Sequence, residues 1–446
     1  MIIPLIALFV AVNGQPKTAT ATALNRFGVT ISQRIAKEGQ NLFVSPASMF
    51  SAVGMLMAAD ADTKMAARKS LLLDDGTPTD DAFWFDFRKP FERDANSQVK
   101  TALANSFWPR RSVLRDTADF EATLQRLHGA TTFPINETDG SQSVALLKEW
   151  VTNATRGVIT EAPVTSFQDI VAMLVNAVYF KGDWTVPFDK KLTEEKGKFA
   201  LCNGETVEVP MMYLNSSEAS KRKKNAEVRF DYALASDHQA IRLPYGNQSE
   251  NGQFEFYMRV MLPTNGDVDA LLASLSAEKL AQVSFRPTKG ELWLPRFSLD
   301  WGFESITAAF RPALPVPPLF EPAALKVVHK ARVSVDEDGS EAAAVTALIF
   351  GKGAAIPPKE PTFSFRANRP FLFAIEHATN GILFMGKVNA LGSAIASTSP
   401  SANCKVKFSE TPAPDAPSPE ETKDSLAPLP LQLSLAALLG AAGASI

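Results

Sequence analysis

The chain has 446 residues, of which 46% are hydrophobic and 21% charged, and its formal net charge is −3 at pH 7. This near-neutral balance leaves a sizeable core possible and gives no reason to expect nucleic acid as a partner. The only histidines are His128, His238, His329 and His377, none at metal-ligand spacing, and no hydrolase, metalloprotease or phosphate-loop motif occurs, so we expect no metal, no cofactor and no catalysis.

The first residues favour export. An apolar run, Ile2–Val12, leads into small residues ending at Gly14, which is typical of a secretory signal over residues 1–14, although no basic residue precedes the run. Four glycosylation sequons begin at Asn136, Asn153, Asn215 and Asn247. We therefore expect a secreted, extracellular glycoprotein with a folded body over residues 15–396. An apolar start without signal function is the alternative.

A compact basic run lies in the middle of the chain, just before a strand predicted at Glu227–Tyr232. It consists of Lys221, Arg222, Lys223 and Lys224. In a secreted protein such a run could hold a sulfated glycosaminoglycan through charge. A solvated loop is the simpler interpretation, and both stay open.

The stretch from Glu337 to Phe350 reads EDGSEAAAVTALIF. Gly339 provides a flexible pivot, and on an extended chain one side carries only small uncharged residues, namely Ser340, Ala342, Ala344 and Thr346. Ala343 and the other odd-numbered residues would point the opposite way. An alanine-rich run also suits a helix or a plain loop. The pattern nevertheless allows this segment to enter a sheet as a strand.

The residues that follow look exposed and cleavable. Residues 351–361 read GKGAAIPPKEP, a glycine- and proline-rich composition typical of a loop open to proteases. A segment that can join a sheet, followed by a cleavable loop, indicates a trap based on strand insertion.

The carboxy-terminal residues differ from the rest in composition. Residues 397–425 are rich in proline, serine, threonine and acids, which predicts a disordered linker. Residues 426–446 are apolar, as in a lipid-anchor signal, a single-span tail or a plain apolar tail. Cys202 in the body and Cys404 in the linker are the only cysteines, and we expect no structural role for a bond between them.

Several motifs occur in an order that is specific to one family. They are Asn41–Met49 (NLFVSPASM), Leu174–Trp184 (LVNAVYFKGDW), Leu243–Tyr245 (LPY), Leu294–Phe297 (LPRF), Val328–Ala331 (VHKA), Asn368–Phe373 (NRPFLF) and Phe384–Val388 (FMGKV). From about Asn25 to Leu391 the chain resembles the serpins, a family of serine protease inhibitors. One departure is the Pro295–His329 segment, which is shorter than usual and has five prolines where a helix would be expected.

The resemblance implies an α+β fold with three β-sheets, a large central one among them, eight or nine helices and an exposed reactive-centre loop over about residues 337–361. It also implies suicide inhibition. The protease attacks the loop and forms an acyl-enzyme, and the cleaved loop then inserts into the central sheet and traps the protease. The expected partner is a serine protease, the protein is expected to be a monomer, and it is no enzyme.

The resemblance also assigns roles to single residues. Glu337, Gly339 and Ser340 begin the hinge of the loop. The polar cluster beneath the opening of the sheet matches Ser45, Ser48, Asn176 and His329, and the aromatic residue at the top of the opening matches Trp184. Without the family, each of these five would be interpreted as core packing.

The scissile bond remains open at this point. The family's usual spacing from Glu337 puts the specificity residue at Gly353, with cleavage at Gly353–Ala354. Lys352, one residue earlier, is the only basic residue between Arg332 and Lys359, so a trypsin-like protease would cut Lys352–Gly353. A non-inhibitory serpin acting as carrier, chaperone or binding protein is the alternative function. The permissive hinge residues favour inhibition.

Overall fold

The computed structural model describes residues 18–92, 98–114, 116–222, 227–250, 252–303, 325–340 and 362–392, with only the backbone at 301–303, 325–328 and 330. Several predictions lie outside the described residues. These are the signal at 1–14, Lys223 and Lys224, the hinge from Ala342 to Thr346, the bonds at Lys352–Gly353 and Gly353–Ala354, most of the short Pro295–His329 segment, the linker and the tail.

Nine α-helices occur within the described residues, in agreement with the eight or nine expected. They are α1 (Ala19–Ile35), α2 (Pro46–Leu56), α3 (Ala61–Ser70), α4 (Asp81–Arg88), α5 (Ala118–His128), α6 (Gly140–Ala154), α7 (Ser216–Arg222), α8 (Val268–Ser274) and α9 (Ala277–Gln282). None of the helices described is long and apolar enough to cross a membrane.

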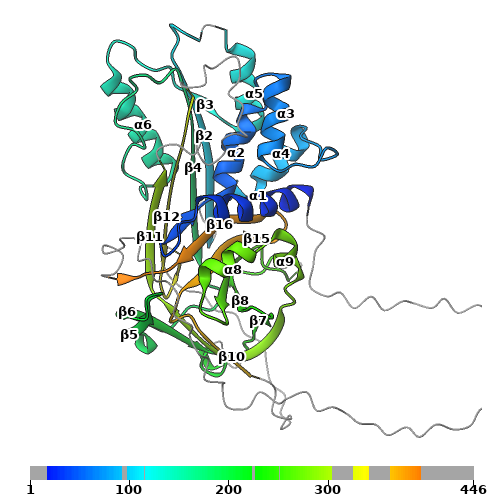
Figure 1. Ribbon diagram of the computed structural model, residues 1–446, viewed down its shortest axis with the longest axis vertical. Helices are drawn as coiled ribbons and strands as arrows, with labels where there is room; N and C mark the ends of the chain where they lie inside the picture. The colour runs from blue at the N-terminus through cyan, green and yellow to red at the C-terminus, as the bar shows by residue number, and fades with distance from the viewer. Residues whose placement is uncertain are drawn as a thin grey trace, which may run out of the picture. The chain divides into compact units, whose positions relative to one another are not determined.

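The central sheet has six strands in the order β11-β12-β13-β4-β2-β3. Their bounds are β11 Phe297–Phe303, β12 Leu325–Val335, β13 Gly339–Ser340, β4 Ala172–Asp183, β2 Val99–Pro109 and β3 Thr131–Thr132. Figure 1 shows α6 on one face of this sheet and α2 on the other. The long strands β2 and β4 pair antiparallel from Val99 opposite Gly182 to Pro109 opposite Ala172.

A second sheet of ten strands contains the two other sheets that the resemblance implied. It follows the order β1-β16-β15-β9-β8-β7-β10-β6-β5, with β14 paired to β10. The strands are β1 (Leu42–Val44), β16 (Gly381–Val388), β15 (Phe371–His377), β9 (Phe256–Pro263), β8 (His238–Tyr245), β7 (Phe230–Leu234), β10 (Arg286–Pro295), β6 (Thr206–Asn215), β5 (Glu194–Ala200) and β14 (Thr362–Arg366). The two parts are joined because β10 pairs with β7 along its first residues and with β6 along its last.

Helix α2 is the buried support beneath the central sheet. The Ser45 side chain caps its first turn by accepting a hydrogen bond from the backbone of Ser48, and Pro46 suits the first helical position because its missing N–H is not needed there. All of its residues are buried. Gly54 is required by packing, since a Cβ atom there would lie 2.1 Å from the ring of Trp84. The central sheet therefore lies against a fully buried and closely packed helix.

Candidate functional site at the opening of the central sheet

Strands β4 and β12 are paired at one end and separated at the other. They run parallel and in register from Leu325 opposite Ala172 to Val328 opposite Val175. At the far end β13 lies between them, with Ser340 opposite both Val335 and Gly182. No pairing between β4 and β12 is recorded beyond Val328 within the described chain. The central sheet is therefore open along part of its length, and the hinge occupies the upper end of the opening.

The two residues of β13 fit this position closely. A Cβ atom on Gly339 would lie 2.1 Å from the carbonyl oxygen of Gly182, so glycine is needed here for close backbone approach. This close approach is a further reason for glycine at 339, beside the flexible pivot that the sequence predicts. Ser340 is buried, and its hydroxyl lies 2.8 Å from that of Tyr245. The side of the hinge that carries Ser340 thus faces the interior.

Glu337 anchors the residues just before β13. Its carboxylate accepts hydrogen bonds from Arg296 Nη2 at 2.6 Å and Nε at 3.2 Å, and from the Thr193 hydroxyl at 2.7 Å. The side chain is 2% exposed. Burial acts to raise the pKa of Glu337, but the bonds from Arg296 and Thr193 outweigh it and hold the pKa below the ordinary 4.5. The carboxylate is therefore charged and fully partnered at neutral pH.

Trp184 lies at the top of the opening, where the resemblance placed an aromatic residue. Its indole stacks on Tyr245, with the ring centres 4.4 Å apart. The indole N–H donates to the Asp336 carbonyl at 2.9 Å, and the Trp184 backbone N–H donates to that of Asp338 at 2.8 Å. Asp338 also pairs with Lys190 at 2.6 Å. Asp336 and Asp338, at the entrance of the opening, are thus held by hydrogen bonds from Trp184 and by the ion pair with Lys190.

His329 connects β12 to the start of α2. Its Nε2 accepts a hydrogen bond from the Ser45 backbone N–H at 3.2 Å, and its Nδ1 lies 3.2 Å from the Ser48 hydroxyl. The Ser45 hydroxyl donates to the Leu383 carbonyl. Because Nε2 accepts, the ring is neutral with its proton on Nδ1. Burial lowers the pKa of His329 to about 3.

Acid should weaken the fold through this neutral histidine. The unfolded-state pKa is about 6.5 and the folded-state pKa about 3, so its contribution is complete above pH 6.5 and is lost as pH falls toward 3. We expect His329→Gln to reduce the slope of unfolding free energy against pH in this window, measured by urea titrations. His128 is also buried with its pKa lowered to about 3, so it should account for the pH dependence that remains in the variant. Equal slopes for wild type and variant would contradict this assignment.

Asn176 belongs to a second polar group, centred on Asn105 of β2. Asn176 Nδ2 donates to Asn105 Oδ1 at 2.6 Å, and the Ser51 hydroxyl donates to the same oxygen at 3.2 Å. Asn105 Nδ2 in turn donates to the His128 carbonyl at 2.8 Å. No bond joins Asn176 to His329 among the described contacts, so the predicted cluster divides into two groups on adjacent strands. The Oδ1 atom of Asn176 is buried without a hydrogen-bond partner among the described residues.

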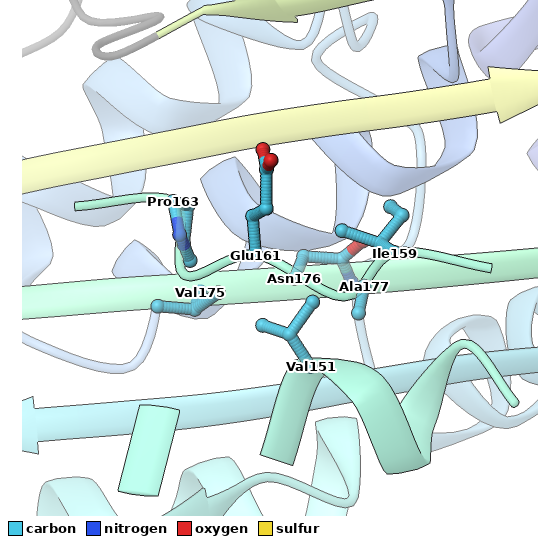
Figure 2. A pocket seen from close by; sticks show the side chains of 7 residues that line it. All are labelled: Val151, Ile159, Glu161, Pro163, Val175, Asn176 and Ala177. Carbon is cyan, nitrogen blue, oxygen red and sulfur yellow. The ribbon is translucent and has the colours of Figure 1, made fainter. Parts of the chain in front are cut away.

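A small pocket adjoins Asn176 on the α6 side of the sheet. Figure 2 shows it between the end of α6, the segment that follows and β4, lined by Val151, Ile159, Glu161, Pro163, Val175, Asn176 and Ala177. Its empty volume is about 270 Å³, including the part open to solvent. The pocket therefore borders β4 beside the opening, on its α6 side.

Sequence reasoning missed several residues of the site. Arg296, Tyr245 and Asn105 received no role, although the first two lie inside the LPRF and LPY motifs. Thr193 and Lys190 belong to no quoted motif. An asparagine in the middle of an apolar strand is unusual, and this was the one signal that could have found Asn105.

The basic run predicted from the sequence is only partly described, and its first residue is paired. Lys221, at the end of α7, pairs with Glu218 at 2.7 Å, which reduces the free positive charge of the basic run. The following strand, β7, begins at Phe230, three residues later than predicted.

The four predicted glycosylation sites differ in exposure. Asn153 and Asn247 are exposed, whereas Asn136 and Asn215 are half-buried. The sequons are therefore not equivalent.

Comparison with known proteins identifies the fold and the family. The family model described as "Serpin (serine protease inhibitor)" matches residues 22–391. Human antithrombin-III is 30% identical over 401 residues, covering 82% of this chain and 80% of the relative, and serpin-Z2 of Arabidopsis thaliana is 29% identical, covering 83% and 88%. The native state of the thermophilic serpin tengpin has a TM-score of 0.68 at 22% identity, covering 83% of this chain and 94% of its own. The chain belongs to the serpin family, whose members are in general inhibitors that target serine proteases.

Proposed function

We propose that this protein is a secreted suicide inhibitor of serine proteases, which traps the acyl-enzyme by inserting its cleaved reactive loop into the central sheet. One observation carries the proposal. Gly339 and Ser340 already pair with β4, and Ser340 also pairs with β12, inside an opening that continues below them. The protein then acts, like serpins in general, as an inhibitor and not as an enzyme.

The register of β13 sets where the rest of the loop would insert. Ser340 lies opposite Gly182 and Val335, and β13 is antiparallel to both neighbours. Continued residue by residue, Ala344 would arrive between Val178 and Ala331, and Thr346 between Asn176 and His329. Residues 341–346 would therefore fill the existing opening. Residues beyond Thr346 would have to separate the pairs from Val175–Val328 downward.

Several features of the loop and of the opening favour this insertion. Each backbone hydrogen bond gained contributes about 0.5–1.5 kcal/mol net. Leu348 and Phe350, on the inward face, would each add roughly 1.5–3 kcal/mol on burial. Thr346 would bring a hydroxyl donor beside Asn176 Oδ1, which has no partner among the described residues. The inward face from Ser340 to Phe350 carries no charge to oppose burial.

The preferred target is a trypsin-like protease that cuts Lys352–Gly353, because its acidic pocket requires a basic side chain. Cleavage at Gly353–Ala354 by a protease with a small pocket is the alternative. We expect the inhibitor to act as a monomer. A non-inhibitory role is the second candidate, and the fold is shared with human thyroxine-binding globulin in complex with thyroxine, which has a TM-score of 0.67 at 20% identity.

The test is to mix the mature protein with trypsin, elastase, chymotrypsin and subtilisin and to analyse the products on denaturing gels. A complex that survives denaturation supports the trap. The first residue of the released peptide then identifies the scissile bond, which is expected to be Gly353. Cleavage without any complex for all four proteases would reject inhibition and favour the carrier or binding role.

The proposal extends to where the protein acts. Export through residues 1–14 and glycosylation would bring it outside the cell, and the apolar tail at 426–446 would anchor it to a membrane if it serves as a lipid-anchor signal. A sulfated glycosaminoglycan would bind the run from Lys221 to Lys224. Replacing the four basic residues by glutamine should then lower the salt concentration at which the protein elutes from heparin. Unchanged elution would exclude the run as the binding site.

Glycan occupancy should differ between two of the sequons. Asn247 is exposed, whereas the amide nitrogen of Asn215 donates to Tyr213 Oη at 3.2 Å and to Glu291 Oε1 at 3.1 Å. A glycan would replace one of those two donated hydrogens. In the secreted protein we expect Asn247 to be occupied and Asn215 to be empty, as measured by mass spectrometry of glycopeptides. The reverse occupancy would contradict the role of these hydrogen bonds.

A further inference from the structure

An apolar stripe is exposed along one flank of α6. Leu146 is 40% exposed, and Trp150, four residues later, is half-buried and packs against the core between α6 and the central sheet. Residues four apart are neighbours on a helix surface. The stripe borders the buried face of α6, which consists of Ser143, Leu147 and Val151. A leucine and a tryptophan are thus side by side where the outer surface of a helix normally carries polar residues.

A glycosylation sequon, Asn153 to Thr155, lies on the same flank. Asn153 is exposed and is the last residue but one of α6. At about 3.6 residues per turn, it lies one turn beyond Trp150 and about 20° around the helix axis from Leu146. Helical side chains lean toward the amino terminus of the helix, so a group attached to Asn153 is directed back over the turn that holds Trp150. The sugar acceptor therefore lies at the end of the apolar stripe.

The amide of Asn153 is available for attachment. No hydrogen bond to its side chain is recorded in the described part of the chain. In contrast, the side-chain amide of Asn136, another acceptor, donates to Gln142 Oε1 at 2.8 Å. A glycan on Asn153 therefore replaces no hydrogen bond of the fold.

We propose that the glycan on Asn153 covers the stripe, with its first N-acetylglucosamine stacked on the Trp150 indole and the next sugar over Leu146. On attachment, the bond from C1 of the first sugar to the pyrophosphate of a lipid-linked donor breaks and a C1–Nδ2 bond forms. The amide gives up one proton as the lipid pyrophosphate leaves. The C–H groups of a sugar face carry slight positive charge, which suits the negative face of an aromatic ring. The inference rests on the proposed export of the chain and not on protease inhibition.

The glycan then acts as a part of the fold. Asn153 belongs to the last turn of α6, and Val151 in the same turn lines the pocket beside β4. A sugar held against Trp150 stabilises this turn on the central sheet and removes the stripe from contact with other proteins. The folding equilibrium constant should be about fivefold larger with the contact than without it, as for a pair of aromatic rings.

Glycopeptide mapping of the full chain, secreted from eukaryotic cells, is the first test. Trypsin releases Glu149–Arg156, a peptide that holds both Trp150 and Asn153. Removing the glycan enzymatically in heavy-oxygen water marks each occupied asparagine, and we expect Asn153 to be occupied. If the other sequons carry glycans and Asn153 does not, this inference alone fails. If the chain is retained in the cell and no sequon carries one, the proposed export fails with it.

Hydroxyl-radical footprinting measures the cover directly. Trp150 should be oxidised several-fold more in Asn153→Gln than in wild type. Asn247→Gln is the matched control, because it removes an exposed sequon between β8 and β9 and should leave the oxidation of Trp150 unchanged. Trp293, half-buried on β10, should react equally in all three proteins. Equal oxidation of Trp150 in wild type and Asn153→Gln would overturn the stacking. Protection that rises with protein concentration would assign the stripe to a second copy of the chain instead.

Urea unfolding, followed by circular dichroism, tests whether the contact stabilises α6. Asn153→Gln should lower the folding equilibrium constant about fivefold. It should have little effect in a Trp150→Leu background, where no ring is left to stack. The sequon is removed at Asn153 and not at Thr155, because the Thr155 hydroxyl is buried and accepts a hydrogen bond from the Ile159 N–H at 3.0 Å. Equal losses in both backgrounds would overturn the role of the indole.

Discussion

Glu337→Gln is expected to destabilise the folded protein by about 3 kcal/mol at neutral pH. The carboxylate is almost fully buried and holds Arg296 and Thr193 together beside the hinge. Glutamine presents an N–H₂ group where one of these donors needs an acceptor. Removing one partner of a buried ion pair costs about 3–5 kcal/mol. Arg296 is 37% exposed and can regain water, so the lower end applies.

Urea unfolding, followed by tryptophan fluorescence, measures the effect. Glu195→Gln is the matched control, because Glu195 also contacts Arg296, at 3.3 Å, but is 65% exposed. An exposed pair of this kind contributes at most about 1 kcal/mol. Equal losses in the two variants would show that burial of Glu337 does not strengthen its interaction.

Wild type and Glu337→Gln should also differ in how their stability responds to acid. The pKa of Glu337 is lower in the folded state than its ordinary 4.5, so its stabilisation is present above pH 4.5 and is lost as pH falls through the folded-state pKa. The difference between wild type and Glu337→Gln should therefore shrink below pH 4.5. A constant difference down to pH 2 would contradict the assigned pKa direction.

The fold could be predicted from the sequence because each local motif forms a local element of the structure. The NLFVSPASM motif became β1, the Ser45 cap and the start of α2, and LVNAVYFKGDW became β4 and the turn to Trp184. Each of these motifs combines strand or helix propensity with a capping or packing residue. Their order along the chain then determined the topology.

The contacts of the site could not be predicted in the same way, because they join residues far apart in the chain. Glu337 meets Thr193 across a separation of 144 residues, and Asn176 meets Asn105 across 71. No local pattern encodes such a pair. Gly339 shows the same limit, since the sequence predicts a flexible pivot there but not the close approach of Gly182, which also requires glycine.

The open part of the central sheet connects these observations. Above it, Glu337 and Trp184 hold the chain that enters, and below it His329 and Asn176 lie on the two strands that must part further. Both lower residues are polar, and each is hydrogen-bonded to further polar groups, His329 to Ser45 and Asn176 to Asn105. A polar pair at this level can exchange hydrogen bonds as the strands separate, which keeps the cost of opening low.

Ala344→Glu is expected to convert the inhibitor into a substrate. In the register fixed by β13, residue 344 would insert between Val178 and Ala331, which are 6% and 1% exposed. A charge buried there without a partner costs several kcal/mol. If about 3 kcal/mol of this cost is felt in the barrier, insertion slows on the order of 100-fold. The protease then deacylates and leaves before it is trapped.

Ala343→Glu is the matched control, since it adds the same charge one residue away on the opposite face. Its neighbours would be Arg332, which is exposed, and Tyr179, which is as buried as Val178 but has the Arg156 guanidinium 5.2 Å from the centre of its ring. Two cations near a new carboxylate make insertion no harder. The ratio of cleaved inhibitor to covalent complex, measured on gels with the protease that wild type traps, should therefore rise only for Ala344→Glu. If Ala343→Glu raised the ratio and Ala344→Glu did not, the inserted strand would be shifted by one residue, because such a slip exchanges its two faces.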